Sequence, residues 1–454
     1  MGKKLFIKTW GCQMNDYDSK KMADVLAPLG YASVDEPDDA DLMILNTCHI
    51  REKATEKLFS DLGRLREHKD SKAARGQKSL IAVAGCVAQA ESEVILQRAG
   101  YVDMVFGPQT YHLLPEMILK ASGDTRVVNT DFPSESKFDH LPGDSIPQGP
   151  SAFLSVQEGC DNFCAFCVVP YTRGAEFSRP AAQVMDEAKR LAGQGAKEIT
   201  LLGQNVNAYH DGTHDLARLI SGIAELNGLE RIRYMTSHPK DMNDNLIHAH
   251  RDIPKLMPFI HLPVQSGSDR MLELMNRKHT VTDYLDTLGK LKEARPDIAI
   301  SSDFIVGFPG ETDADHQATL ALARQIGFAS CYSFKYSPRP GTPGAAMDGV
   351  VPEAVKDARL QELQTLLFDR QRDYNRQSVG AIVPVLFDRK GRRPGQLLGK
   401  TPYMQSVYAD APEHLFGRIV NVRIEKATQN GMTGTIVTTE EISPSNPNEE
   451  KEAA

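Results

Sequence analysis

The amino-terminal part of the chain repeats a short apolar run that is followed by a longer amphipathic stretch. The runs LFIKTWGC, DLMILNTC and SLIAVAGC end at Cys12, Cys48 and Cys86, and a fourth run, VDMVFGP, covers residues 102–108 without a cysteine. Each run has the length and apolar character of a buried strand, and helical periodicity fills the stretches between them. Strands that alternate with helices predict a parallel sheet with right-handed crossovers. We therefore expect a parallel α/β domain over residues 1–120.

The same alternation returns at residue 151 with six further strand patterns: SAFLSV, KEITLL, RIRYM, PFIHL, IAISSDFIVGF and ASCYSFKYS. Six β/α units form a partial version of the eight-unit barrel, open on one side. We expect this partial (β/α)6 barrel over residues 151–377, with a long amphipathic helix at 352–377 packed on its outside. The stretch before it, residues 121–150, is rich in Ser, Pro, Gly and Asp, which is typical of a linker.

From residue 378 onward the apolar runs become short and β-branched. The runs GAIVPVLFD, QSVYAD, GRIVNVRIEKA and TGTIVTT are separated by Gly and Pro turns. This pattern predicts a small antiparallel β-barrel of about five strands over residues 378–440. Residues 441–454 have the composition of a disordered tail, EISPSNPNEEKEAA. The predicted fold class is thus α/β, with three folded domains.

Composition places the chain among ordinary globular proteins. No run of about eighteen apolar residues appears, so we expect no membrane span. The first residues lack the apolar core and cleavage site of a signal peptide, which favours a cytoplasmic location. Lasting disulfides are rare in that compartment, so the seven cysteines indicate metal binding or catalysis.

The charge balance limits how a nucleic acid could be held. The net charge of −8 excludes a surface that is basic throughout. The last domain is locally basic, and four cations within five residues could bind phosphates or form only a solvated loop tip: Arg389, Lys390, Arg392 and Arg393.

Three cysteines lie in one loop directly after the first barrel strand, where the chemistry of such barrels is found. Cys160, Cys164 and Cys167 follow the pattern C-x3-C-x2-C. They supply three thiolates, whereas a closed 4Fe–4S cluster or a structural zinc site needs four. A distant fourth ligand could complete a zinc site, but zinc sites usually pair their cysteines as C-x2-C twice over. An iron left open can bind a small molecule.

The cysteines that end the three amino-terminal strands form a second set. The carboxyl ends of parallel strands share one edge of the sheet, so Cys12, Cys48 and Cys86 should lie together there. Gly11 and Gly85 precede two of them and would let the backbone approach a bulky cluster. The pattern predicts a second three-cysteine cluster, although free cysteine is often buried and the three thiols could be unrelated.

The Cys160–Cys167 loop resembles that of the radical S-adenosylmethionine (SAM) enzymes. In that superfamily the open iron binds SAM, and one electron cleaves it to methionine and a 5′-deoxyadenosyl radical. Two three-cysteine sites, a partial barrel and a small β-barrel, in this order, resemble the radical SAM methylthiotransferases over nearly the whole chain. The resemblance implies two 4Fe–4S clusters, one on each cysteine set, and an RNA-binding TRAM-like domain. One SAM would methylate sulfur on the second cluster, and another would supply the radical.

The motifs KTWGCQMNDYDS and NTCHIREKA are most similar to the branch that converts N6-isopentenyladenosine, next to the anticodon of tRNA, to its 2-methylthio form. Sibling branches act on threonylcarbamoyladenosine in tRNA or on a ribosomal-protein aspartate. Two alternative functions are also compatible with the residues: a radical SAM enzyme with an auxiliary electron-transfer cluster, and a zinc-stabilised RNA-binding protein. The resemblance implies a tRNA partner, an electron donor such as flavodoxin or ferredoxin, and a monomer. One departure is that Met404 and Gln405 stand near where the family has an Asn-Arg pair.

The barrel loops and the resemblance together indicate where SAM would bind. Polar and glycine-rich segments follow the expected barrel strands, as in LLGQNVN, TSHP and LPVQSGSD. SAM is expected near five residues on this edge: Phe166, Gln204, Ser237, Gln265 and Asp303. An apolar pocket at the barrel mouth would receive the isopentenyl group.

Overall fold

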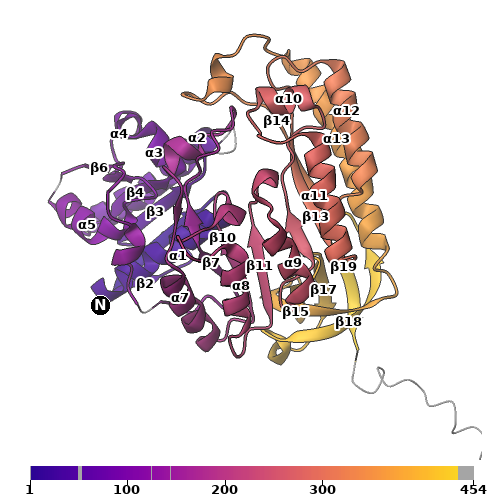
Figure 1. The fold of residues 1–454 in the computed structure, drawn as a ribbon. Helices are drawn as coiled ribbons and strands as arrows, with labels where there is room; N and C mark the ends of the chain where they lie inside the picture. Colours follow the sequence, from indigo (N-terminus) through magenta and orange to yellow (C-terminus); the bar gives the residue numbers. More distant parts are fainter. Residues whose placement is uncertain (1, 50–53, 124, 144, 438–454) are drawn as a thin grey trace, which may run out of the picture.

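The computed structural model describes residues 2–49, 54–123, 125–143 and 145–437 (Figure 1). The tail expected at 441–454 lies outside these residues. Three folded parts follow one another in chain order: an α/β domain, a partial barrel and a small closed β-barrel. In the part of the chain that is described, none of the helices is both long and apolar enough to cross a lipid bilayer.

The amino-terminal domain is a six-stranded sheet in the order β2-β1-β3-β4-β5-β6, and all of its pairs are parallel. The sequence predicted four of these strands. The two edge strands it missed are short and mostly not buried, unlike the equally short but fully buried β5, and β6 lies in the stretch expected to be a linker. The strands are β1 (Lys3–Thr9), β2 (Tyr31–Ser33), β3 (Leu42–Thr47), β4 (Leu80–Gly85), β5 (Met104–Phe106) and β6 (Val127–Asn129).

Helices cover both faces of this sheet, which explains its uninterrupted apolar strands. Successive side chains of a strand point to opposite faces, so Ile44 and Ala82 join one core while Leu45 and Val83 join the other. The first core is closed by α1 (Gln13–Leu26) and α5 (Leu114–Ser122), and the second by α2 (Ala54–Ala74), α3 (Cys86–Glu91) and α4 (Glu93–Arg98).

The central domain confirms the expected partial barrel. Two three-stranded parallel sheets, β7-β10-β11 and β12-β13-β14, are joined through a bridge between Ile232 and Leu256. The barrel is therefore open between β7 and β14. Its strands are β7 (Ser151–Ser155), β10 (Glu198–Leu202), β11 (Arg231–Met235), β12 (Phe259–His261), β13 (Ala299–Val306) and β14 (Ser330–Lys335).

Alternate strand residues of the barrel pack outward against a layer of helices. Leu201, Ile232 and Phe304 belong to this shared core, so the residues between them, such as Asp303, face the lumen. The covering helices are α7 (Ala181–Gly193), α8 (Leu216–Ala224), α9 (Asp244–Asp252), α11 (Val281–Ala294), α12 (Asp313–Ile326) and α13 (Glu353–Arg376). The short helix α10 (Asp269–Leu274) packs on a separate cluster instead.

The last domain is a closed barrel in the order β15-β16-β17-β19-β18. Four of its pairs are antiparallel, as predicted, and the pair β17–β19 is parallel. A separate small core that includes Val385, Phe387 and Val422 fills it. The strands are β15 (Ile382–Lys390), β16 (Gln396–Lys400), β17 (Ser406–Asp410), β18 (Ile419–Ala427) and β19 (Met432–Ile436).

Two buried arginines of β11 fasten the last domain to the barrel. The Arg231 guanidinium donates to the carbonyls of Lys400 and Pro384 at 2.8 Å each, and that of Arg233 donates to Thr401 and Pro402 at 2.8 Å each. Arg231 is the first residue of β11. The small barrel therefore packs at the amino-terminal ends of the strands, opposite the loops at their carboxyl ends (Figure 1).

Candidate functional site

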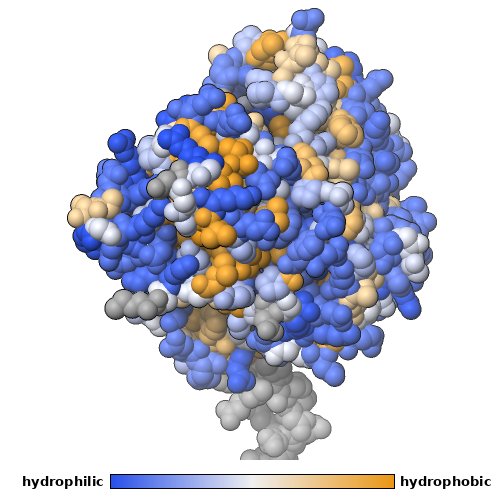
Figure 2. All heavy atoms as spheres, turned by 90° about the vertical axis from the view of Figure 1, so that its left-hand side faces the viewer, coloured by the Kyte–Doolittle hydropathy of each residue, from blue (hydrophilic) through white to orange (hydrophobic). Residues whose placement is uncertain are grey.

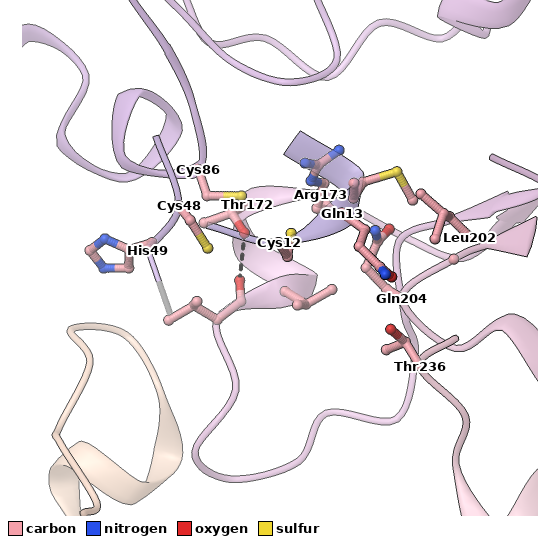
Figure 3. A pocket seen from close by; sticks show the side chains of 14 residues that line it. Cys12, Gln13, Cys48, His49, Cys86, Thr172, Arg173, Leu202, Gln204 and Thr236 are labelled. Carbon is pink, nitrogen blue, oxygen red and sulfur yellow. Dashed lines mark hydrogen bonds between the residues drawn. The ribbon is translucent and has the colours of Figure 1, made fainter. Parts of the chain in front are cut away.

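The three amino-terminal cysteines lie together at one edge of the first sheet, as their positions after the strands predict. Cys12 caps α1 after β1, Cys48 follows β3, and Cys86 begins α3 after β4. All three line one cavity of about 150 Å³ (Figure 3). Their thiols face a common space, so one group can be held by all three.

The two glycines beside these cysteines are required by close packing of the backbone. Gly11 has φ +123°, and a Cβ there would lie 2.2 Å from the Cβ of Cys48. Gly85 has φ +88°, and its Cβ would lie 2.3 Å from the carbonyl oxygen of Thr47. The sequence suggested that these glycines make room for a cluster; the structure shows that they let the cysteine-bearing segments approach one another.

The opposite wall of the same cavity belongs to the barrel. Gly203 and Gln204 follow β10, Thr236 follows β11, and Thr172 ends the short helix α6 (Val169–Thr172). Figure 3 shows Gln204 and Thr236 across the space from Cys12. The sulfur atoms of the first domain thus face the carboxyl ends of the barrel strands.

Arg173 supplies positive charge to the amino-terminal thiols. A hydrogen bond with Cys48 lowers the pKa of Cys12 to about 6, and Arg173 adds to this effect against burial. Burial raises the pKa of Cys86, and the Arg173 charge opposes that rise. Because the thiolate is the form that binds iron, a buried guanidinium beside these cysteines fits a cluster site.

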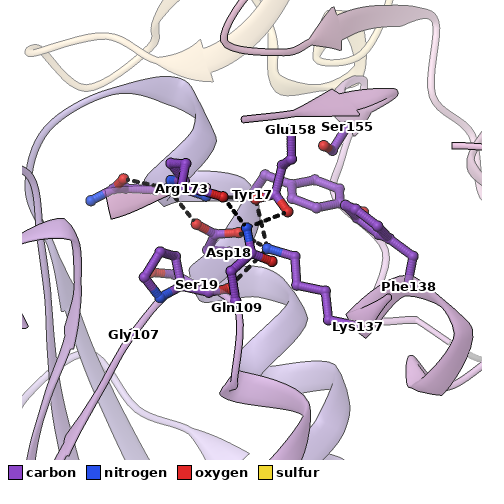
Figure 4. Close-up of polar contacts among 12 residues, drawn as sticks. Tyr17, Asp18, Ser19, Gly107, Gln109, Lys137, Phe138, Ser155, Glu158 and Arg173 are labelled. Atoms are coloured by element: carbon purple, nitrogen blue, oxygen red, sulfur yellow. Dashed lines mark hydrogen bonds and ion pairs between the residues drawn. The ribbon is translucent and has the colours of Figure 1, made fainter. Parts of the chain in front are cut away.

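Arg173 is held by a buried ionic network that joins the two large domains (Figure 4). It lies 2.7 Å from Asp18 of α1 and 2.8 Å from Glu158 of the barrel domain. Lys137 lies 2.6 Å from the same Glu158 carboxylate. All four side chains are at most 3% exposed, so loss of one partner would leave a buried charge uncompensated. Lys137 comes from the expected linker, which is therefore part of the domain joint.

In the barrel loop, each cysteine sulfur lies close to an N–H donor. The Arg277 guanidinium donates to Cys164 Sγ at 3.3 Å, and the backbone N–H of Val169 donates to Cys167 Sγ at 3.5 Å. The Asn162 amide lies 3.6 Å from Cys160 Sγ. Burial raises the pKa of Cys167 to about 12. Donors to sulfur stabilise cluster ligands and tune the cluster.

This loop is anchored to distant parts of the barrel. The backbone N–H of Ala165 donates to the Met275 carbonyl at 2.9 Å, and the Asn276 side chain donates to the Phe163 carbonyl at 2.9 Å. Phe163 has φ +48°, a conformation that side chains rarely adopt. Strain of this kind persists where surrounding contacts enforce it, which is common at functional sites.

No group of three His, Cys, Asp or Glu side chains in the described part of the chain is arranged to hold a single metal ion. A cubane cluster needs a different arrangement, because each of its three protein thiolates binds a different iron atom. Both cysteine sets, each with three thiols and a nearby arginine, fit such a cluster.

Three of the five residues expected near SAM carry buried polar atoms that lack a hydrogen-bond partner within the described residues. These are Ser237 Oγ, Gln265 Oε1 and Asp303 Oδ1, although Asp303 also lies 3.5 Å from His261 Nε2. Gln265 has φ +77° and Thr236, beside Ser237, has φ +70°. Unpartnered polar atoms and strained backbone at this end of the barrel fit the expectation of a polar ligand there.

The other two expected SAM residues have contacts of their own. The Gln204 side-chain oxygen accepts a hydrogen bond at 2.7 Å from the backbone N–H of Gly159, next to the cysteine loop. Phe166 packs against a cluster that includes Met275 and Phe308. Both residues lie at the predicted edge, and both also support the loop itself.

We expect Ser237→Ala to weaken SAM binding several-fold, because a ligand hydrogen bond to Oγ is lost while no protein bond breaks. Gln204→Ala should instead reduce the iron bound per chain, because the Gly159 N–H loses its acceptor. Equilibrium dialysis with SAM and an iron assay separate the two effects. Unchanged SAM affinity in Ser237→Ala would remove this residue from the site.

The four cations of the last domain lie at the end of β15 and in the turn after it. Three of them already face acids: Arg389 lies 3.3 Å from Asp388, Lys390 2.8 Å from Glu413, and Arg393 3.2 Å from Asp410. Exposed pairs of this kind are weak, so phosphates can compete for the cations. The local positive charge is nevertheless smaller than the sequence alone suggested.

The departure from the family pattern at Met404 and Gln405 has a structural reason. Gln405 is buried, and its amide donates to Asn375 Oδ1 at 3.0 Å. Met404 packs with Phe259 at the base of the barrel. This turn is used for docking between domains.

Comparisons with known proteins agree with this architecture. Residues 4–107 match the model of the uncharacterized protein family UPF0004, residues 154–323 that of the radical SAM superfamily, and residues 376–437 that of the TRAM domain. Among solved structures, the radical SAM methyltransferase TsrM from Kitasatospora setae shares the fold, with a TM-score of 0.58 and 15% identity over 88% of this chain and 81% of that one. The cobalamin-dependent SAM radical enzyme OxsB shares it with a TM-score of 0.53 and 12% identity, over 80% of this chain and 56% of that one.

The fold and the cysteine loop define a radical SAM enzyme with a carboxyl-terminal TRAM domain, which uses a 4Fe–4S cluster and SAM. A protein of Maricaulis maris (strain MCS10), named tRNA-2-methylthio-N(6)-dimethylallyladenosine synthase, is 57% identical over 444 residues, which cover 96% of this chain and 97% of that protein. The chain belongs to this family of synthases, which confirms the resemblance to radical SAM methylthiotransferases.

Several residues that shape the site could not be found from the sequence. Arg173 and Arg277 reach cysteines from positions without any motif spacing, and Thr236 lies in the TSHP segment without being singled out from it. The glycines and the six cysteines were found because their spacing reflects the chemistry directly.

Proposed function

We propose that this chain adds a methylthio group to N6-isopentenyladenosine next to the anticodon of tRNA. One observation carries the proposal: a single cavity is lined by Cys12, Cys48 and Cys86 on one side and by Gln204 and Thr236 of the barrel on the other. A sulfur carrier and a radical source must act on the same carbon, so their sites have to share a space. The name of the Maricaulis relative supports the substrate.

When bound, a cluster on Cys160, Cys164 and Cys167 would supply the electron that cleaves SAM, and a second cluster on the amino-terminal cysteines would carry the transferred sulfur. The chain itself does the positioning. Arg277 holds the sulfur of Cys164, and the buried network around Arg173 fixes the two domains relative to each other. A fixed distance between the two domains would keep the SAM-cleaving site and the sulfur-carrying site in the geometry that the reaction needs.

The second cluster, a small redox protein such as flavodoxin or ferredoxin as electron donor, a monomeric state and a cytoplasmic location are parts of the same proposal. The test is reconstitution under anaerobic conditions with SAM, a reductant and an isopentenylated anticodon stem-loop, followed by mass spectrometry of the nucleosides. The 2-methylthio nucleoside is the expected product. Modification of threonylcarbamoyladenosine or of a protein aspartate in its place would assign the chain to a sibling activity.

We expect that replacing Arg389, Lys390, Arg392 and Arg393 with Ser weakens binding of isopentenylated tRNA and flattens its salt dependence. Contacts between cations and phosphates release counterions, so each lost contact reduces the salt slope. The reduction should be modest, because three of the cations are already paired with acids. Binding is measured by anisotropy across a salt titration. An unchanged slope would place the phosphate contacts elsewhere.

A further inference from the structure

A second cavity, of about 390 Å³, opens beside the cysteine cavity. The two cavities share His49, Val168 and Thr172. The second is within the usual size range of ligand pockets, roughly 300–1,000 Å³. None of the six cluster cysteines lines it, so it can take a different part of the substrate. Its remaining walls are Thr55, Gln89, Ala90, Glu91, Tyr171, Arg339, Pro340 and Gly341.

Walls from three parts of the fold meet in this cavity. One wall comes from the amino-terminal domain, a second from α6 just after the cysteine loop, and a third from the loop after β14. A cavity between these parts is suited to a ligand that reaches the cysteines from outside. Figure 2 shows one face of the molecule, on which hydrophobic side chains form an exposed patch with hydrophilic side chains around it.

Tyr171 presents an aromatic ring at this cavity and to solvent. Its side chain is 45% exposed, and its ring lies edge-on to that of Phe163, with centroids 6.4 Å apart. Phe163 is itself 49% exposed, although it lies between two cluster cysteines. An exposed aromatic ring offers a surface on which an unstacked RNA base can stack.

The position of Tyr171 is rigid although its ring is exposed. Its neighbours Thr172 and Arg173 are buried, the first bonded to the Val168 carbonyl at 3.1 Å and the second held in the ionic network. A ring on a fixed backbone loses little entropy when a base stacks on it. Arg339 lies across the same cavity with a charge suited to phosphate, and the Glu91 carboxylate could accept an N–H of a base edge.

We propose that this second cavity binds an anticodon-loop nucleotide that flanks the modified adenosine, with Tyr171 stacked on its base and Arg339 beside its phosphate. The proposal rests on the proposed tRNA substrate. It explains how a protein with net charge −8 holds RNA near its catalytic centre: stacking supplies affinity where few cations are present. It also keeps the flanking nucleotide out of the cysteine cavity, which is left for the target base.

The test couples a protein change to an RNA change. Affinity of the holoenzyme for an isopentenylated anticodon stem-loop is measured for wild type and Tyr171→Ala. It is then measured again with stem-loops in which one loop nucleotide at a time is abasic. Tyr171→Ala should weaken binding about tenfold, the usual worth of one base stacked on an aromatic ring. One flanking abasic position should weaken wild-type binding equally and have no further effect in Tyr171→Ala.

Three controls make the result specific. Tyr171→Phe keeps the ring and should bind nearly as wild type does, whereas Phe368→Ala removes a comparably exposed aromatic side chain from α13 and should have no effect. Arg339→Ala should reduce the salt slope of binding. All variants are compared at equal iron content per chain, so that cluster loss does not imitate lost RNA contacts.

Unchanged affinity for the stem-loop in Tyr171→Ala would overturn the subsite. It would also be overturned if every abasic position weakened binding of Tyr171→Ala by the same factor as binding of the wild type. The proposed function is judged by a different readout, formation of the methylthio nucleoside by wild-type enzyme. A stem-loop that couples to Tyr171 but yields no such product would keep the subsite and refute the activity. Formation of the methylthio nucleoside without coupling between Tyr171 and any abasic position would support the activity and refute the subsite.

Discussion

Replacing Cys160, Cys164 and Cys167 with Ala is expected to lower the iron bound per chain to about half and to abolish 5′-deoxyadenosine formation, since one of two four-iron clusters is lost. No other thiol can substitute, because the remaining cysteines lie in the first domain or, as Cys331, within β14. The loop itself should stay in place, because its backbone bonds to Met275 and Gly344 do not involve sulfur.

Anaerobically reconstituted protein is assayed for iron, sulfide and reductive SAM cleavage by liquid chromatography. Cys331→Ala is the matched control: it removes a thiol that packs against the barrel core and should leave iron and SAM cleavage at wild-type levels. The amino-terminal cluster should keep its iron in the triple variant. If that variant still cleaves SAM, the assignment of this loop is wrong.

Elements of the fold with several consecutive apolar residues were predictable, and those defined by contacts between domains were not. β3 and β4 are buried at every position and stand out in the sequence. β2 and β6 have three residues each and exist because a neighbouring strand offers hydrogen bonds. The stretch 121–150 has the composition of a linker, yet Lys137 within it is buried between two carboxylates. Composition does not reveal such pairing.

The candidate site shows the same division. Cysteine spacing and strand ends predict which thiols converge, because a cluster needs several thiolates and a parallel sheet aligns its strand ends. Arg277 is 113 residues from the Cys164 sulfur that it contacts, and nothing in its neighbourhood in the sequence marks it. Gln204 was expected near SAM from its loop, but its bond to Gly159 could be known only from the structure.

The triple variant with Ala at Cys12, Cys48 and Cys86 should separate radical formation from sulfur transfer. We expect it to retain reductive SAM cleavage, now uncoupled from substrate, and to form no detectable methylthio nucleoside. The physical reason is the division of the cavity: these thiols follow strands of the first sheet, whereas Gln204 and Thr236 on the opposite wall belong to the barrel. Iron should again fall to about half, since one cluster of two remains.

The variant also tests whether the domain joint survives without the cluster. Asp18, Lys137, Glu158 and Arg173 bond to one another through their own charged groups, so the joint should persist when the sulfur atoms are removed. Limited proteolysis of the 121–150 stretch reports on this, with Lys137→Ala as the variant in which the joint is weakened. With an intact joint, lost product and retained SAM cleavage identify the amino-terminal cysteines as the sulfur site. A normal rate of methylthiolation would show instead that the sulfur comes from elsewhere in the molecule.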